Sequence, residues 1–155
     1  AVLVCGMGRA AVAATLPAAL DRLRPTLVIN AGIAGALDDR WPLASTWRID
    51  HVHAARGRPW ACPAPNTAPA HLVALPMARL VTVDRPVFDA VRRRRLARRA
   101  DLVDMEGAAV VDCCHRAGVE VLLVKTVSDR AVCREDLHCG LARSVAMLAR
   151  ILAGG

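Results

Sequence analysis

Aromatic residues are scarce in this sequence, and tyrosine is absent. The chain of 155 residues has one Phe, three Trp and no Tyr, so aromatic residues make up 3% of it. Proteins that bind single-stranded nucleic acid without sequence preference stack the bases on aromatic side chains. The composition therefore argues against that class of protein, although the formal net charge is +7 at pH 7.

Membrane-spanning and disulfide-framework signals are also missing. No apolar run reaches the ~20 residues that a membrane-spanning helix needs, and no signal peptide is recognisable. The six cysteines have no repeating spacing and no C-x-x-C pair. A zinc site could recruit Cys133, His138 and Cys139, but without such a pair we expect no metal. We expect reduced thiols, no integral membrane association and a cytoplasmic protein.

Positive charge is concentrated in the stretch VRRRRLARR, residues 91–99. On a helix, Arg92, Arg95 and Arg99 follow spacings of three and four residues and share one face. A solvated helix face explains this pattern best, and an anionic membrane or nucleic-acid surface is the alternative. We therefore expect no nucleic-acid partner.

Strand-like and helix-like segments alternate along the chain, which is long enough for one domain. Strands are predicted at 1–5, 26–30, 46–54, 78–84, 100–104 and 119–125. Helices are predicted at 9–23, where Pro17 kinks or restarts the helix, and at 87–99, 105–118 and 136–153. Residues 56–69 read as a Pro-rich loop. The pattern predicts a single-domain α/β fold, a three-layer sandwich with a mixed, mostly parallel central sheet.

Three of the predicted strands, TLVIN, ADLVD and VEVLLVK, are almost continuously apolar, as buried parallel strands are. They are followed by AGIAG, by Met105–Glu106 and by Ser128–Asp129. If the strands run parallel, these clusters lie at one sheet edge, where α/β folds bind ligands. Singly, AGIAG could be a tight turn, Glu106 a helix-dipole charge and Ser128–Asp129 a turn cap. Their coincidence at one edge favours a site.

The residue types of these clusters suit a neutral, polar ligand. A carboxylate such as Glu106 can accept hydrogen bonds from a pair of sugar hydroxyls. An aspartic acid in a partly desolvated site can have a raised pKa and donate a proton. Together they suggest cleavage of a glycosidic bond through an oxocarbenium-like state. The motifs G-x-x-x-x-G-K-[ST], G-x-S-x-G and H-E-x-x-H are absent, so their chemistries lack support.

The stretches VINAGIAGAL, VDMEGAAV and LLVKTVSDRA resemble, in this order, the nucleoside phosphorylase and nucleosidase superfamily. This superfamily includes methylthioadenosine/S-adenosylhomocysteine nucleosidase. The stretch LVTVDRPV is similar to the hopanoid-associated nucleosidase branch. The resemblance implies a phosphorylase/hydrolase-like fold, a purine nucleoside substrate, no cofactor and a homo-oligomer.

The resemblance also implies roles for individual residues. Asp129 is the catalytic residue that protonates the leaving purine at N7, and Ser128 positions it. Glu106 binds the ribose hydroxyls, and Met105 packs beside the sugar. The remaining substrate-binding positions are Ala34 and Gly35, close to the ribose or the nucleophile, and Val87, whose backbone contacts the base.

Hydrolysis is favoured over phosphorolysis. Phosphorylases of this superfamily bind phosphate with an Arg and a Ser around the glycine segment, where this chain has Asn30 and Ile33. Neither side chain supplies a positive charge, although Arg9 could substitute. Lys125 stands where methylthioadenosine nucleosidases carry Arg, and Pro86 where they carry a base-stacking Phe, so another nucleoside branch fits as well.

The sequence begins at Ala1, inside the expected fold. Nucleosidases of the superfamily have a preceding strand and hairpin that supply a water-activating glutamate. Residues 1–155 are therefore expected to form a nucleosidase-like domain without that segment. Two alternatives to a hydrolase follow: a phosphate-dependent phosphorylase, and a non-catalytic nucleoside-binding fragment.

Overall fold

The computed structural model describes residues 1–54 and 58–154, and the side chains of residues 136 and 139 are outside its description. Its helices are α1 (Arg9–Leu23), α2 (Ala70–Val73), α3 (Ala90–Ala97), α4 (Gly107–Ala117) and α5 (Arg134–Leu152). Its strands are β1 (Leu27–Ala36), β2 (Thr46–His53), β3 (Trp60–Ala61), β4 (Met77–Thr82), β5 (Leu102–Asp104) and β6 (Glu120–Asp129). Among the described residues, no helix is both long and apolar enough to cross a bilayer.

The sheet is mixed, and five of its strands close on themselves. The strand order is β3-β2-β4-β5-β1-β6, and β6 also pairs with the first residues of β2. The longest pairings, β1–β6 and β2–β4, are parallel, whereas β1–β5 and β2–β6 are antiparallel. Five strands thus form a ring, and the short β3 adds to the end of β2.

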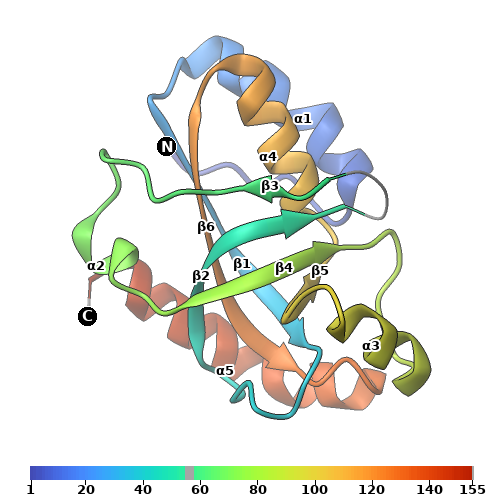
Figure 1. Cartoon of the computed structure of the whole chain (residues 1–155). Helices are drawn as coiled ribbons and strands as arrows, with labels where there is room; N and C mark the ends of the chain where they lie inside the picture. The colour runs from blue at the N-terminus through green and yellow to red at the C-terminus, as the bar shows by residue number, and fades with distance from the viewer. Residues whose placement is uncertain (55–57, 155) are drawn as a thin grey trace.

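Helices cover both faces of the sheet, as Figure 1 shows. Helices α1 and α4 pack against each other on one face, and α5 packs on β6 and β1 on the other. The largest apolar cluster lies under α1 and α4 and includes Leu16, Ile49 and Leu123. A smaller cluster under α5 contains Leu122 and Val124. The predicted single-domain α/β sandwich is confirmed.

Two predicted strands are longer in the structure, because the segments that follow them also belong to the sheet. β1 continues through AGIAGA to Ala36, and β6 continues through TVSD to Asp129. The alternative that AGIAG is a tight turn is wrong, and the strand predicted to end at residue 125 continues to Asp129, because the two segments pair with each other. Gly32 pairs with Lys125, and a register shift between Ala34 and Gly35 brings Gly35 opposite Asp129.

The three strands that were expected to run parallel do not all do so. β1 and β6 are parallel, but β5 is antiparallel to β1 through the pairs Gly35–Val103 and Ala36–Leu102. After the register shift that follows Ala34, the last two residues of β1 pair with β5. The clusters therefore meet at the far end of β1 rather than along one common edge.

The predicted strand at residues 1–5 does not form. These residues have no regular secondary structure, and Val2 and Val4 are 96% and 86% exposed. A strand is stabilised by backbone hydrogen bonds to a neighbour, and within the described residues none is recorded for this run. The helix after it is confirmed as α1, and Pro17 lies inside it without ending it.

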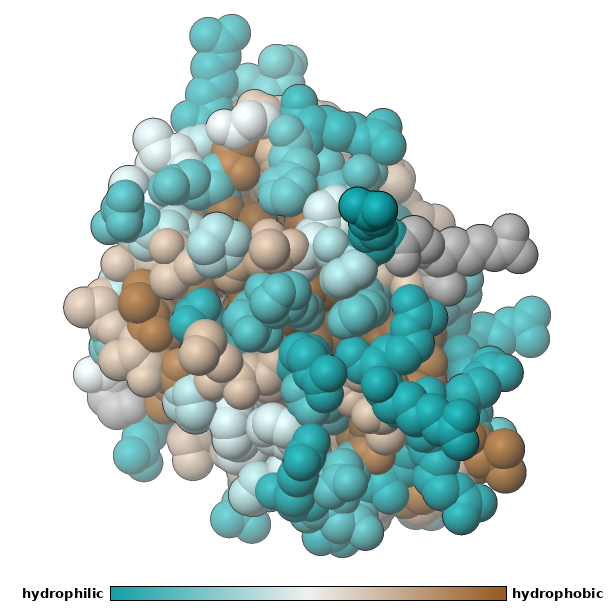
Figure 2. Space-filling view, in the orientation of Figure 1, coloured by the Kyte–Doolittle hydropathy of each residue, from teal (hydrophilic) through white to brown (hydrophobic). Residues whose placement is uncertain are grey.

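The basic stretch forms α3, which is shorter than predicted and begins at the N-cap Asp89. Figure 2 shows hydrophilic side chains gathered over the corner that α3 occupies in Figure 1. Of the predicted face, Arg95 and Arg99 are exposed and Arg92 is partly exposed, whereas Arg93 turns toward the sheet. Its side chain is 13% exposed and donates to the Ala36 carbonyl (3.2 Å) and to Asp39 (2.8 Å).

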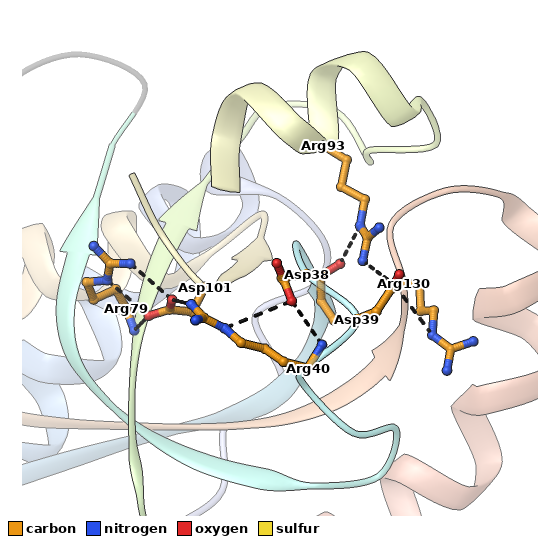
Figure 3. A network of polar contacts seen from close by, with 8 residues as sticks. Asp38, Asp39, Arg40, Arg79, Arg93, Asp101 and Arg130 are labelled. Atoms are coloured by element: carbon orange, nitrogen blue, oxygen red, sulfur yellow. Dashed lines mark hydrogen bonds and ion pairs between the residues drawn. The ribbon is translucent and has the colours of Figure 1, made fainter. Parts of the chain in front are cut away.

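Two groups of ion pairs surround the end of β1, as Figure 3 shows. In one, Arg93 and Arg130 approach Asp39. In the other, Arg79 and Arg40 hold Asp101, the residue before β5. Both groups of ion pairs hold neighbouring segments together around the end of β1, beside Gly35.

Candidate active site

Gly35 lies between Asp129 at the end of β6 and Val103 in β5, the strand that precedes Met105–Glu106. A Cβ at this position would lie 3.0 Å from Asp129 Oδ1, 3.2 Å from Ala131 Cβ and 3.3 Å from Val103 Cγ1. A side chain here would push these neighbours away by a few tenths of an ångström, so a glycine lets β5 and β6 close around β1. The ends of three strands therefore meet at one residue.

Asp129 is buried at the last position of β6, and each of its carboxylate oxygens has a hydrogen-bond partner. Oδ1 accepts from the Ala131 amide at 2.8 Å, and Oδ2 lies 2.6 Å from the Ser128 hydroxyl. The same hydroxyl lies 3.3 Å from the Ala34 carbonyl. Because a hydroxyl has one hydrogen, donation to Ala34 leaves its oxygen free to accept from a protonated Asp129. The arrangement accommodates the carboxyl in either protonation state.

Glu106 is the N-cap residue of α4, but its side chain makes no capping hydrogen bond. Oε1 accepts from the Gly8 amide at 2.5 Å, and Oε2 accepts from the Met105 amide at 3.3 Å. Glu106 thus joins the glycine turn before α1 to the end of β5. The sequence did not indicate this contact, because the two residues are 98 positions apart.

Val87 and Met105 belong to one apolar cluster. Val87 is 4% exposed and packs with Val103 and Ala131, and the half-buried Met105 packs against the same group. Because Val103 and Ala131 also adjoin Gly35, this cluster forms an apolar wall beside Asp129. Gly35 thus lies with Ala34, Ser128 and Asp129, and the apolar cluster connects Val87 and Met105 to them. Glu106 follows Met105 directly.

A cavity of about 790 Å³ opens beside Met105, between the first turns of α1 and α4. Its lining is mostly apolar and comprises Met7, Gly8, Arg9, Ala10, Ala13, Ala54, Trp60, Asp84, Met105, Ala108, Ala109 and Asp112. Glu106 contacts this lining through Gly8. Within the described part of the chain, Asp129 is not among the lining residues, so the cavity covers the Met105 side of the site alone.

Three buried polar residues near Glu106 were not among the residues that the sequence predicted for the site. Asp104 forms an ion pair with Lys125 Nζ at 2.9 Å, and the Thr82 hydroxyl donates to Asp104 Oδ1 at 2.7 Å. Lys125 was considered only for its departure from an arginine. A lysine that ends the apolar run VEVLLV was the signal that a buried counter-charge must exist.

The buried thiols are poor nucleophiles. Burial raises the pKa of Cys62 to about 11 and that of Cys114 to about 12. Since thiolates are the reactive form, both thiols are inert at neutral pH. Among the described residues, no group of three or more His, Cys, Asp or Glu side chains is placed to hold a metal ion; the side chain of Cys139 is outside this search.

Residues 66–153, more than half of the chain, match the sequence model of the phosphorylase superfamily. The chain belongs to this superfamily. The matched range contains Val87, Met105, Glu106 and Asp129. The resemblance that the sequence suggested is therefore confirmed at the level of the superfamily.

Solved structures of other proteins share the fold of this superfamily member. The 5′-methylthioadenosine/S-adenosylhomocysteine nucleosidase of Helicobacter pylori has a TM-score of 0.81 at 18% identity, covering 97% of this chain and 76% of its own. Futalosine hydrolase of the same species has a TM-score of 0.81 at 19% identity, with coverage of 96% and 75%. A nucleosidase of the first kind from Chlamydia trachomatis, bound to adenine, has a TM-score of 0.73 at 24% identity, with coverage of 95% and 71%.

Proposed function

We propose that this chain hydrolyses the N-glycosidic bond of a purine nucleoside. The observation that carries the proposal is the convergence at Gly35, which brings a buried, hydrogen-bonded Asp129 against the segment that bears Met105 and Glu106. Asp129 is the proton donor and Glu106 the ribose ligand. The likeness in fold to nucleosidases and to a futalosine hydrolase supports the same class of reaction.

The proposed reaction assigns each proton and electron pair. The bond between the anomeric carbon and N9 of the purine breaks, and its electron pair moves to the base. Asp129 donates a proton to N7, so the base leaves neutral. Water adds to the oxocarbenium-like carbon and passes one proton to bulk solvent, from which Asp129 is reprotonated for the next turnover. Glu106 accepts hydrogen bonds from the ribose hydroxyls and thereby orients the sugar.

Water is the proposed nucleophile rather than phosphate, because two cations that could bind phosphate, Lys125 and Arg9, are already paired. Lys125 is buried against Asp104, and Arg9 forms an ion pair with Asp84. Ile33 offers no donor and Asn30 no charge. A dianion at this place would have to displace one of the two carboxylates.

We also propose that residues 1–155 act as one nucleosidase-like domain in a cytoplasmic homo-oligomer. Met105 and Ser128 are proposed to contact or position the substrate, as are Ala34, Gly35 and Val87. Ser128 and Ala34 act through the hydrogen bonds described for Asp129. Val87 and Met105 supply apolar contact to the base and sugar.

The test is chromatography of the purified chain incubated with adenosine, 5′-methylthioadenosine, futalosine or inosine, each with and without phosphate. Release of the base without phosphate is expected. Release that depends on phosphate would instead establish a phosphorylase. If a nucleoside binds by calorimetry but none in the panel is cleaved, the chain is a binding module for that nucleoside.

A further inference from the structure

Directly beneath Met105–Glu106, three buried polar side chains connect three strands to the start of α4. Thr82, Asp104 and Lys125 end or follow apolar runs of β4, β5 and β6, and their exposed fractions are 0%, 6% and 2%. Asp104 Oδ1 accepts from the Thr82 hydroxyl at 2.7 Å, and Oδ2 pairs with Lys125 Nζ at 2.9 Å. The three groups form one connected network.

The network, rather than the side chain of the N-cap residue Glu106, caps α4. The first amides of a helix lack partners within the helix and need acceptors. Asp104 Oδ2 accepts from the Gly107 amide at 2.9 Å, and the Thr82 hydroxyl oxygen accepts from the Ala108 amide at 2.9 Å. Glu106, which stands at the N-cap, is thereby released from capping and keeps its carboxylate directed to Gly8.

Lys125 makes this arrangement possible. It is the only lysine in the sequence, although the chain has twenty-one basic residues of the Lys and Arg types. A buried carboxylate without a counter-charge is strongly destabilising, and Lys125 supplies that charge. The ammonium fits because the neighbouring strand has a glycine, since a Cβ at Gly32 would lie 3.2 Å from Lys125 Nζ.

We propose that Thr82, Asp104 and Lys125 are positioning residues that fix the direction of the Glu106 carboxylate. They act through the turn that precedes α4 and do not touch the substrate. What Glu106 binds, the ribose hydroxyls, rests on the proposed function. The orientation of Glu106 toward Gly8 is inferred from the network and does not depend on the proposed function.

Thr82→Val is the main test, because it removes the hydroxyl but keeps a β-branched side chain of similar size. The variant should raise KM for the preferred ribonucleoside about tenfold, the scale of one lost hydrogen bond to a charged group. It should raise KM for the 2′-deoxy analogue less, because that analogue has fewer hydroxyls for Glu106. Thr82→Ser, which restores the hydroxyl, should recover most of the ribonucleoside KM.

A merely structural role would give a different pattern. Equal losses on both nucleosides, or the same loss in a Glu106→Gln background as in the wild type, would overturn the proposal. Thr46→Val is the matched control, since Thr46 shares a buried hydroxyl contact with Thr126 away from Asp104. It should change neither KM.

Amide hydrogen exchange tests the positioning without any substrate. The Gly8 amide donates to Glu106 and the Ala131 amide donates to Asp129, so each reports on one site carboxylate. In Thr82→Val, exchange at Gly8 should accelerate while exchange at Ala131 stays unchanged. An unchanged Gly8 rate would refute the positioning even if nucleosides are cleaved.

The two hypotheses can therefore fail separately. If the wild type cleaves no nucleoside but Gly8 responds to Thr82→Val, the proposed function fails and the positioning stands. Should Thr82→Val not fold, Thr82→Ala provides the second variant, because it removes the hydroxyl while leaving the buried Asp104–Lys125 pair intact. It should produce the same selective acceleration at Gly8.

Discussion

At the scale of single residues, the proposed chemistry depends on two carboxyl groups with different surroundings. Asp129 is buried, and one of its oxygens faces a hydroxyl that can donate or accept. Glu106 is half-buried and accepts from backbone amides. The first environment suits proton transfer, and the second suits holding a polyhydroxylated ligand.

Substitution of each carboxyl by its amide should separate these roles. Asp129→Asn keeps the shape but cannot supply the proton, so kcat should fall roughly 100-fold or more, while nucleoside affinity changes little. Glu106→Gln should raise KM about tenfold, because an amide is a weaker acceptor than a carboxylate. Steady-state kinetics and calorimetric binding measure both effects.

The control for these variants is Asp21→Asn, which changes an exposed carboxyl on α1 and should leave both parameters unchanged. Normal turnover by Asp129→Asn would refute its role as proton donor. A KM that does not move in Glu106→Gln would refute the contact with the ribose.

At the scale of elements, α3 is attached to the sheet by two half-buried apolar side chains and one arginine. The helix has no fully buried residue, and Leu96 and Ala97 pack against the cluster around Val103. Arg93 reaches the Ala36 carbonyl at the end of β1. Since Gly35 precedes Ala36, this anchor also holds the wall of the proposed site.

Arg93→Ala should therefore lower the free energy of unfolding by about 1–2 kcal/mol, the range for loss of a buried hydrogen bond and its partner. Arg95→Ala, which removes an exposed arginine from the same helix, should change it by less than about 0.5 kcal/mol. Urea denaturation of the two variants gives the comparison. Equal effects would mean that Arg93 is no more than a surface charge.

The sequence predicted the elements better than their ends and pairings. Periodicity found α1 and α4, and the glycine after α4 was expected and has a positive φ of 66°. The glycines of AGIAG suggested a turn because glycine is common in turns. Here they are needed for close approach within a strand, to Lys125 and Asp129, and no local pattern distinguishes these two uses.

The candidate site was predictable as a set of residues but not as a geometry. Asp129, Glu106 and their neighbours were predicted from motifs, and the fold brings their segments together. The Gly8–Glu106 bond and the Asp104–Lys125 pair join positions far apart in the chain. Such contacts depend on strand order, and the antiparallel pairing of β5 with β1 could not be derived from apolar runs alone.

At the scale of the whole molecule, acid should destabilise the fold through Asp101. Its burial acts to raise the pKa of the carboxyl, but hydrogen bonds from Arg79 and the charges of Arg79 and Arg40 outweigh burial and lower the pKa. A lowered pKa stabilises the folded state above the unfolded value of about 3.9. This contribution is lost as the pH falls through the folded-state pKa.

Asp101→Asn should therefore reduce the free energy of unfolding at pH 7 by roughly 1–3 kcal/mol. The difference from the wild type should shrink as the pH is lowered below about 4. Urea titrations at several pH values measure this convergence. A difference that stays constant down to pH 2 would show that Asp101 acts through shape and not through its charge.

The closed ring of strands has a consequence for synthesis of the protein on the ribosome. Among the strands of the described residues, β6 comes last in sequence, yet it pairs with both β1 and β2 and carries Asp129. Until residue 129 has left the exit tunnel, the nascent sheet has two open edges, which are available to chaperones or to another chain. The proposed active site is thus assembled in a single late step, with the arrival of the strand that closes the sheet.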